Sequence, residues 1–243
     1  MSKAVLITGG SRGIGRATAL AAARRGWSVA INYVRDAQAA EATASEARAL
    51  GVQAVVLQAD VALESDVLAL FDASEAALGP LSGVVINSGI VAPSSRLADM
   101  SFDRLKRMFD LNVMGAFLCA REAARRLTAG GSVVIVSSVA ARLGSPDEYV
   151  DYAASKGALD TLTIGLAKEL GPQGVRVNAV RPGLIETDIH ASGGRPDRAQ
   201  VLGAGVPLRR PGRAEEVADA IVWLLGDEAS YVTGSLMDIA GGR

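Results

Sequence analysis

The chain has 243 residues, of which 49% are hydrophobic and 21% charged, a balance typical of a globular protein with a sizeable core. Its 25 basic and 26 acidic residues give a formal net charge of −1, and the basic residues are scattered. We therefore expect no nucleic-acid partner. The single cysteine, Cys119, excludes an intrachain disulfide, and its apolar neighbours predict that it packs in the core.

No apolar run approaches the roughly 18 residues that a membrane-spanning helix needs. The first predicted strand begins by about Ala4, which leaves no room for a signal peptide. We therefore expect a cytoplasmic protein that does not associate with membranes.

Strands and helices are predicted to alternate along the chain with short connections. The strands are expected at 3–8, 27–33, 52–58, 83–87, 131–138, 174–180 and 235–239. The helices are expected at 16–25, 37–50, 63–78, 101–128, 152–170 and 214–225. Continuous apolar runs are typical of strands buried on both faces. The pattern predicts one α/β domain over 1–243, a Rossmann-type doubly wound parallel sheet of about seven strands with helices on both faces.

A glycine-rich turn joins the first predicted strand to the first predicted helix. Residues 8–15 read Thr-Gly-Gly-Ser-Arg-Gly-Ile-Gly, a spacing that differs from the general G-x-G-x-x-G fingerprint. Glycine lets the backbone approach a pyrophosphate, and a helix N-terminus offers free N–H groups to an anion. The strand–turn–helix context favours a phosphate-binding loop over an ordinary glycine-rich turn.

Tyr152 and Lys156 stand four residues apart at the start of a predicted helix, so their side chains are expected on one face. A free phenol has a pKa of about 10, and a nearby positive charge lowers it. The pair could transfer protons, and an amphipathic surface pair is the alternative.

These motifs, taken together, resemble the short-chain dehydrogenase/reductase family over nearly the whole chain. They are 8–15, Asp60, Asn87-Ser88-Gly89, Asn112, Ser138, Tyr152 with Lys156, Arg181-Pro182-Gly183 and the closing segment 231–242. The nearest likeness is to glucose 1-dehydrogenase-like proteins and 3-oxoacyl carrier-protein reductases. The resemblance implies an NAD(P)-dependent enzyme that interconverts a carbonyl and a secondary alcohol. Its partner would be a small-molecule carbonyl or alcohol substrate, and a homotetramer is expected.

The resemblance assigns catalytic roles to four residues. Tyr152 would exchange a proton with the substrate oxygen, and Lys156 would lower the Tyr152 pKa and hold the nicotinamide ribose. Ser138 would hydrogen-bond the substrate oxygen, and Asn112 would support Lys156 through a water. Ser138 lies 14 residues before Tyr152, one more than the usual family interval, which points strictly to Val139. Because valine cannot donate a hydrogen bond, we infer a one-residue insertion within 140–151.

The resemblance also implies a set of cofactor contacts. They are Gly9, Ser11, Arg12, Gly13, Ile14, Gly15, Asn32, Tyr33, Asp60, Val61, Asn87, Gly89, Tyr152, Lys156, Pro182, Gly183, Ile185 and Thr187. Asp60 would contact the adenine, or alternatively cap the next helix. Ser88 stands where the family usually has alanine, so a hydroxyl is expected near the cofactor.

No acidic residue precedes Asp36 at the end of the second predicted strand, where an acid would repel a 2′-phosphate. Arg12 and Arg35 could instead bind that phosphate, unless both are simply solvated. We predict NADP(H) as the preferred cofactor, with NAD(H) possible, and no metal site.

Residues 188–210 resemble a substrate lid. The segment contains His190, to which we assign no role, and few aromatic or long apolar residues, which argues against a large apolar substrate. The alternative function is a catalytically silent NADP(H)-binding sensor or scaffold. That alternative predicts a damaged catalytic set, whereas all four catalytic residues are present.

Overall fold

The computed structural model describes residues 3–189 and 193–243, so His190 lies outside the described residues. Within them, seven parallel strands form the main sheet in the order β3-β2-β1-β4-β5-β6-β9. The strands are β1 (Ala4–Ile7), β2 (Ser28–Tyr33), β3 (Ala54–Gln58), β4 (Gly83–Ile86), β5 (Ser132–Val136), β6 (Arg176–Pro182) and β9 (Leu236–Ile239). The predicted doubly wound α/β fold is confirmed.

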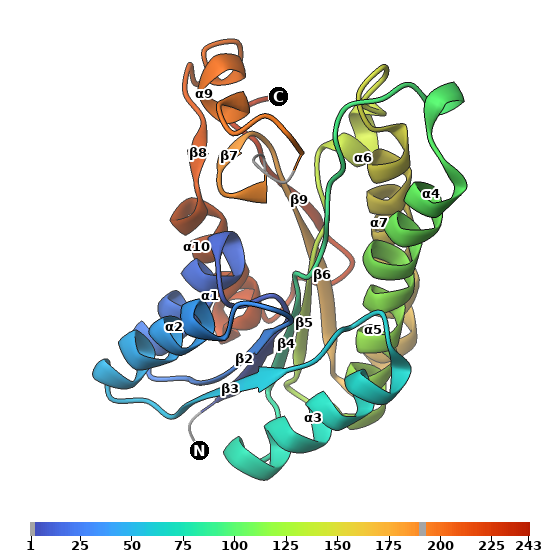
Figure 1. The fold of residues 1–243 in the computed structure, drawn as a ribbon. Coiled ribbons are helices and arrows are strands. Elements are labelled where there is room, and N and C mark those ends of the chain that lie inside the picture. The colour runs from blue at the N-terminus through green and yellow to red at the C-terminus, as the bar shows by residue number, and fades with distance from the viewer. Residues whose placement is uncertain (1–2, 190–192) are drawn as a thin grey trace.

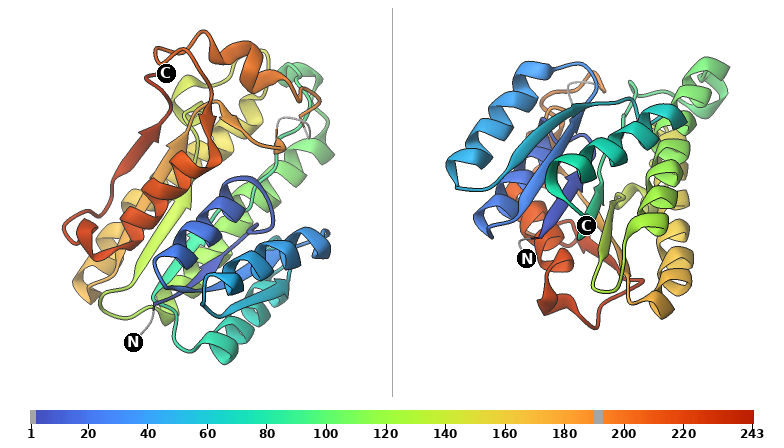
Figure 2. Two further views of the ribbon diagram at one scale, coloured as in Figure 1. Left: turned by 90° about the vertical axis from the view of Figure 1, so that its left-hand side faces the viewer. Right: turned by 90° about the horizontal axis from the view of Figure 1, so that it is seen from below.

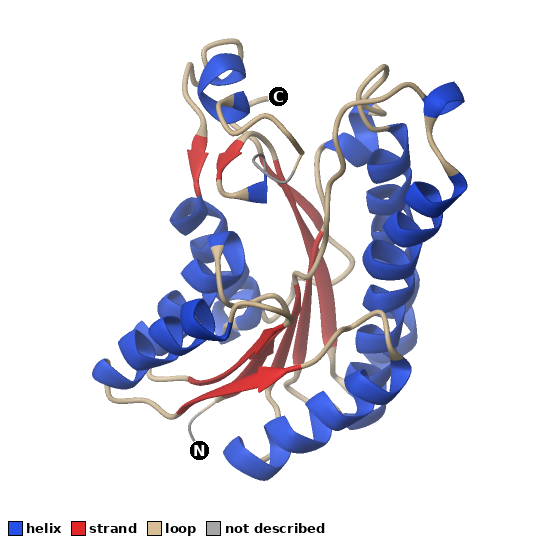
Figure 3. Cartoon of the chain, in the orientation of Figure 1, coloured by secondary structure: helices blue, strands red, loops and turns tan. Residues whose placement is uncertain are grey.

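Helices cover both faces of this sheet (Figures 1 and 3). One face carries α1 (Gly13–Arg24), α2 (Ala37–Ala49) and α10 (Ala214–Leu225). The other carries α3 (Glu64–Leu78), α4 (Phe102–Phe109), α5 (Gly115–Arg126) and α7 (Val150–Leu170). A hydrophobic cluster lies on each face of the sheet. Along β1, Val5 and Ile7 belong to the cluster on one face and Leu6 to the cluster on the other, as the alternation of side chains in a strand requires. This burial on both faces explains the continuous apolar runs of the strands.

Short elements complete the chain, and several lie at the carboxyl ends of the strands (Figure 2). They are η1 (Leu97–Asp99), η2 (Asp110–Met114), α6 (Ala140–Leu143), η3 (Gly171–Gln173), β7 (Ile185–Glu186), α9 (Arg198–Gly203), β8 (Gly212–Arg213) and η4 (Asp227–Ala229). β7 and β8 pair in parallel as a small second sheet. They flank residues 188–210, the segment that the sequence predicts as a lid, and α9 lies within that segment.

Two local predictions need correction. The helix expected over 101–128 is interrupted by a π-helical turn at Asp110–Met114, which separates α4 from α5. The loop expected between Ala140 and Asp151 contains the single-turn helix α6. Both features flank the site, where π-helical turns are frequent.

Cys119 is fully buried, and burial raises the pKa of its thiol to about 12, as a packing role requires. In the described part of the chain, no helix is long and apolar enough to cross a membrane. No cluster of three or more His, Cys, Asp or Glu side chains able to hold a metal occurs among the described residues.

Candidate active site

The glycine-rich turn is fastened to the neighbouring strand by reciprocal hydrogen bonds. Thr8, at the end of β1, accepts at its Oγ1 from the backbone N–H groups of Asn87 (2.9 Å) and Ser88 (3.0 Å). The Asn87 amide in turn donates to the carbonyls of Thr8 (2.9 Å) and Gly9 (3.1 Å). Asn87 therefore fixes the path of the turn as well as lining the pocket described below.

Glycine is required where the turn enters α1. A Cβ placed on Gly15 would lie 2.3 Å from the Gly9 carbonyl oxygen and 2.7 Å from Asn87 Nδ2. Gly9 and Gly13 adopt φ of +62° and +52°, the left-handed region that side chains disfavour. The half-buried Ser11 lies in the same turn, where its carbonyl accepts from Thr43. The turn thus leaves the start of α1 open to an anion, as a dinucleotide pyrophosphate requires.

The ends of β2 and β3 lie beside this turn. Asn32 is fully buried; its Oδ1 accepts from Gly9 N–H (3.1 Å) while its Nδ2 donates to carbonyls including that of Ala59 (3.0 Å). Asn32 therefore holds the glycine-rich turn in place through its hydrogen bond with Gly9. Asp60 Oδ1 accepts from Ala62 N–H (3.0 Å), and Val61 is buried in the core.

Two arginines are exposed near the same turn. Arg12 immediately precedes α1, and Arg35 follows β2 beyond the half-buried Tyr33. Neither forms an ion pair with another residue of 3–189 or 193–243, whereas the neighbouring Arg16 binds Glu46 at 2.7 Å. The two unpaired guanidinium groups are available to a phosphate.

Tyr152, Lys156 and Ser138 meet at the carboxyl end of β5. Lys156 is 3% exposed, its Nζ donates to the Val136 carbonyl (2.8 Å), and it lies 5.7 Å from the centroid of the Tyr152 ring. The side chains of Ser138 and Tyr152 are hydrogen-bonded to each other. Ser138 Oγ also accepts from Ala140 N–H at 3.1 Å, so the hydroxyl is held in place.

The electrostatics of this group differ from the sequence expectation. Burial raises the pKa of Tyr152, and the hydrogen bond from Ser138 offsets this only in part. Burial lowers the pKa of Lys156 to about 8, against the opposing influence of Asp160. The net shift is upward because desolvation of the phenolate dominates. The contribution of Lys156 to the Tyr152 pKa stays a prediction. Tyr152 is held in its protonated form, which suits a proton donor.

Asn112 lies in the π-helical turn and is fully buried. Its Oδ1 accepts from Ile90 N–H (2.8 Å), and its Nδ2 donates to the Ile90 carbonyl (2.9 Å) and Ser155 Oγ (3.2 Å). A Cβ placed on Gly89 would lie 3.4 Å from both Asn112 Oδ1 and Lys156 Nζ. Asn112 and Lys156 therefore converge on the glycine that follows β4.

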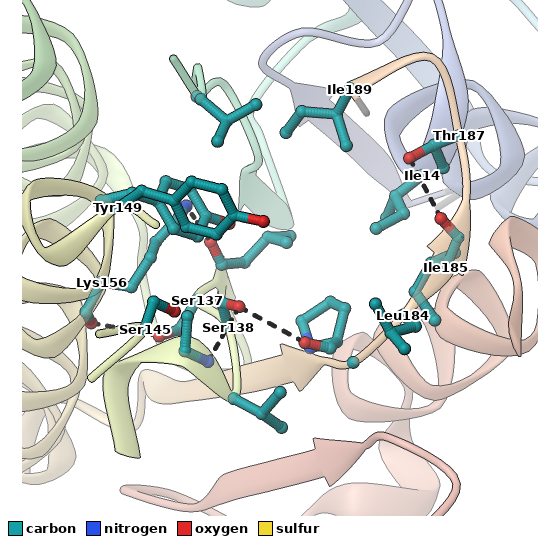
Figure 4. A pocket seen from close by; sticks show the side chains of 18 of the residues that line it. Ile14, Ser137, Ser138, Ser145, Tyr149, Lys156, Leu184, Ile185, Thr187 and Ile189 are labelled. Carbon is teal, nitrogen blue, oxygen red and sulfur yellow. Dashed lines mark hydrogen bonds between the residues drawn. The ribbon is translucent and has the colours of Figure 1, made fainter. Parts of the chain in front are cut away.

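A pocket that is open to solvent contains Ser138, Tyr152 and Lys156. Figure 4 shows this pocket from close by. Tyr149 and Lys156 lie on one side of it, and Ile14 and Thr187 lie on the other. Of the predicted residues it is lined by Ile14, Asn87, Gly89, Ser138, Tyr152, Lys156, Pro182, Gly183, Ile185 and Thr187. The remaining predicted residues lie outside this lining: Asn112 packs behind Gly89, and the others belong to the glycine turn or the ends of β2 and β3.

Sequence reasoning missed several residues that line the pocket. They are chiefly Val91, Leu143, Ser145, Tyr149, Leu184, Ile189, Arg198 and Arg243. Tyr149 carries a weak signal, since it lies in the segment before Tyr152. Arg198 carries none, because an arginine in a segment rich in glycine and proline is ordinarily solvated.

A parallel doubly wound sheet with a glycine turn and a Tyr–Lys pair at its carboxyl edge is the arrangement of an NAD(P)-dependent oxidoreductase. The family model for enoyl-(acyl carrier protein) reductase matches residues 9–243. An uncharacterised oxidoreductase of Escherichia coli (strain K12), YgfF, is 52% identical over 243 residues, covering 98% of each chain. The 3-oxoacyl-acyl-carrier-protein reductase FabG of Staphylococcus aureus is 34% identical, covering 100% of this chain and 98% of the relative.

The structural comparison agrees with these matches. A short-chain dehydrogenase from Burkholderia cenocepacia J2315, solved in complex with NADP, has a TM-score of 0.92 and 35% sequence identity. The match covers 99% of this chain and 97% of that chain. This protein therefore belongs to the short-chain dehydrogenase/reductase family.

Proposed function

We propose that the protein is an NADP(H)-dependent oxidoreductase that interconverts a carbonyl and a secondary alcohol, with Tyr152 as its acid–base group. The observation that carries the proposal is the convergence of Ser138, Tyr152 and Lys156 in one pocket that also contacts the glycine turn through Ile14 and Asn87. A hydride donor and an acid placed on either side of a carbonyl are what this reduction needs.

The chain's own residues supply orientation and the proton. Ser138 is a hydrogen-bond donor fixed beside the Tyr152 hydroxyl, so a substrate oxygen can be held by both groups. In the reductive direction the Tyr152 hydroxyl gives its proton to that oxygen, and in the oxidative direction the phenolate removes it. Lys156 lies over the same ring, where its charge stabilises the phenolate that forms.

The residues present fit a dinucleotide phosphate. Gly15 packs too closely against the Gly9 carbonyl for a side chain to fit, which keeps the turn tight. The first turn of α1 has no side-chain cap and no acidic residue, so its N–H groups could meet a pyrophosphate. Arg12 and Arg35 would hold the 2′-phosphate, Asp60 the adenine end, and Lys156 the ribose near Tyr152. The bound cofactor supplies or accepts the hydride. NADP in the 35%-identical Burkholderia structure supports this choice, with NAD(H) as the weaker alternative.

The pocket walls also bear on the substrate class. Val91, Leu143, Leu184 and Ile189 line the same pocket as Tyr152 and contribute aliphatic surface to it. We infer that the substituents flanking the carbonyl are small and apolar, since the site offers them few hydrogen-bonding groups.

The direct test is turnover of NADPH and NADH by the purified protein with a panel of aldehydes, ketones, diketones, quinones, sugars and 3-oxoacyl thioesters. The matching alcohols test the reverse direction. We expect NADPH-dependent reduction of one apolar class. Tight NADPH binding with no turnover on any compound would reject the enzyme and favour a sensor or scaffold, the alternative function.

The oligomeric state and location are also proposals. Phe109, Met114, Phe117 and Ile164 are exposed on neighbouring helices, which supports burial of this face in a homotetramer. Light scattering of the purified protein should give four times the 25.0 kDa chain mass. Cell fractionation should find the protein in the cytoplasm.

A further inference from the structure

A partly buried ion pair joins the lid to the segment before Tyr152, with the Arg198 side chain 9% exposed and the Glu148 side chain 31% exposed. Arg198, the first residue of α9, is 7% exposed and binds Glu148 through both arms of its guanidinium group. The distances are 2.7 Å from Nη1 to Oε1 and 2.6 Å from Nη2 to Oε2, across 50 residues of sequence. Two parallel charge-assisted hydrogen bonds fix both position and orientation.

The same guanidinium group covers an aromatic ring that contacts Tyr152. Arg198 Cζ lies 5.0 Å from the centroid of the Tyr149 ring, within the range of a cation–π interaction. The Tyr149 ring meets the Tyr152 ring edge to face, with centroids 6.2 Å apart and planes at 86°. Arg198 thus reaches Tyr152 through one intervening ring.

Tyr149 is a wall of the pocket and does not compete with Tyr152 for the proton. It is 8% exposed and lines the pocket (Figure 4). Arg198 belongs to the same lining. Burial raises its pKa to about 12, against the opposing charge of Arg198, so the phenol stays neutral at physiological pH. Its contribution is therefore shape and packing next to the reacting oxygen.

The ion pair between Arg210 and Glu216, near the end of the predicted lid, provides a comparison. Arg210 binds Glu216 with an equally short fork, at 2.6 and 2.8 Å, but its side chain is 50% exposed and does not line the pocket. The two carboxylates are equally exposed, Glu148 at 31% and Glu216 at 30%, so the pairs differ in the burial of the guanidinium group. Burying that charge carries a desolvation cost that the exposed Arg210 avoids. The placement of the Arg198–Glu148 pair is thus better explained by positioning than by stability.

We propose that Arg198 is a positioning and specificity-determining residue, which with Glu148 holds the Tyr149 ring against Tyr152 and shapes the wall that receives the substrate. The inference rests on the proposed carbonyl–alcohol activity. It predicts that Arg198 controls substrate fit and leaves cofactor binding alone, because its contacts are with Glu148 and Tyr149, neither of which is assigned to the cofactor.

The test compares Arg198→Met with Arg210→Met as the matched control. Arg198→Met should raise KM for the preferred carbonyl at least about tenfold, with a smaller change in kcat and an unchanged Kd for NADPH. It should also flatten the ranking of kcat/KM across carbonyls of increasing size, which a purely structural role would not do. Arg210→Met should behave as the wild type in all these measurements.

Two further variants keep the test decisive if Arg198→Met folds poorly. Tyr149→Leu retains the ion pair and removes the ring, and should reproduce the KM rise and the loss of size discrimination. Glu148→Gln combined with Arg198→Met removes both charges and should give no larger KM defect than Arg198→Met alone. Wild-type KM and size ranking in folded Arg198→Met or Tyr149→Leu would overturn the inference. A wild-type protein without turnover would instead overturn the proposed function.

Discussion

Replacing Lys156 by methionine should make the protein more stable at neutral pH while removing its activity. Burial lowers the Lys156 pKa from 10.5 to about 8. At pH 7 the buried ammonium group therefore destabilises the folded state by about 3 kcal/mol. Methionine keeps a long apolar chain and gives up the hydrogen bond to the Val136 carbonyl, a loss of about 1 kcal/mol. The expected net gain is about 2 kcal/mol.

The pH dependence distinguishes this cause from a general packing effect. Between pH 8 and 10.5 the unfolded chain holds the Lys156 proton that the folded chain has released, so wild-type stability rises with pH across that window. The advantage of Lys156→Met should therefore be close to zero near pH 10. Urea unfolding of both proteins at pH 7 and pH 10 measures it. Destabilisation at pH 7, or an advantage of the same size at both pH values, would refute the reasoning.

Three other substitutions test separate parts of the site. Gly15→Ala places a Cβ against the Gly9 carbonyl oxygen and should abolish NADPH binding in fluorescence titrations, whereas Gly171→Ala, with no atom within 4 Å of its Cβ, should bind normally. Arg12→Ala should raise the Kd for NADPH about tenfold by loss of a charge-assisted hydrogen bond and leave NADH binding unchanged, as isothermal titration can measure; equal effects on both cofactors would contradict a phosphate contact. Ser138→Ala should lower turnover roughly 10-fold or more below that of the Val139→Ala variant, because only serine donates to the substrate oxygen. A larger loss in Val139→Ala would show that the 14-residue interval was misassigned.

The sheet was predictable because local sequence determines it. Continuous apolar runs such as that of β1, whose Val5 and Leu6 face opposite cores, indicate strands buried on both faces, and glycines mark where helices end. The π-helical turn at Asp110–Met114 was not predictable, because its residues follow the same periodicity as the flanking helices. It depends on contacts of the Asn112 amide with Ile90 and Ser155, which are distant in sequence.

The site was predictable only as far as its motifs reach. Tyr152, Lys156 and the glycine turn are recognisable from spacing, and Ser138 follows once the extra residue is placed before Tyr152. The Arg198–Glu148 pair is not, since each side chain alone is a typical solvated residue and only the fold brings them together. The direction of the Tyr152 pKa also depends on burial, which no sequence pattern measures.

The most direct measurement for the central claim uses Tyr152→Phe, which keeps the ring and removes the hydroxyl. NADPH affinity by fluorescence titration and single-turnover oxidation of bound NADPH by the preferred carbonyl are measured on the same preparation. The account predicts unchanged NADPH affinity and a rate lower by roughly 10²-fold or more, the scale of a lost general acid. A rate close to that of the wild type would contradict the role of Tyr152 as the acid–base group.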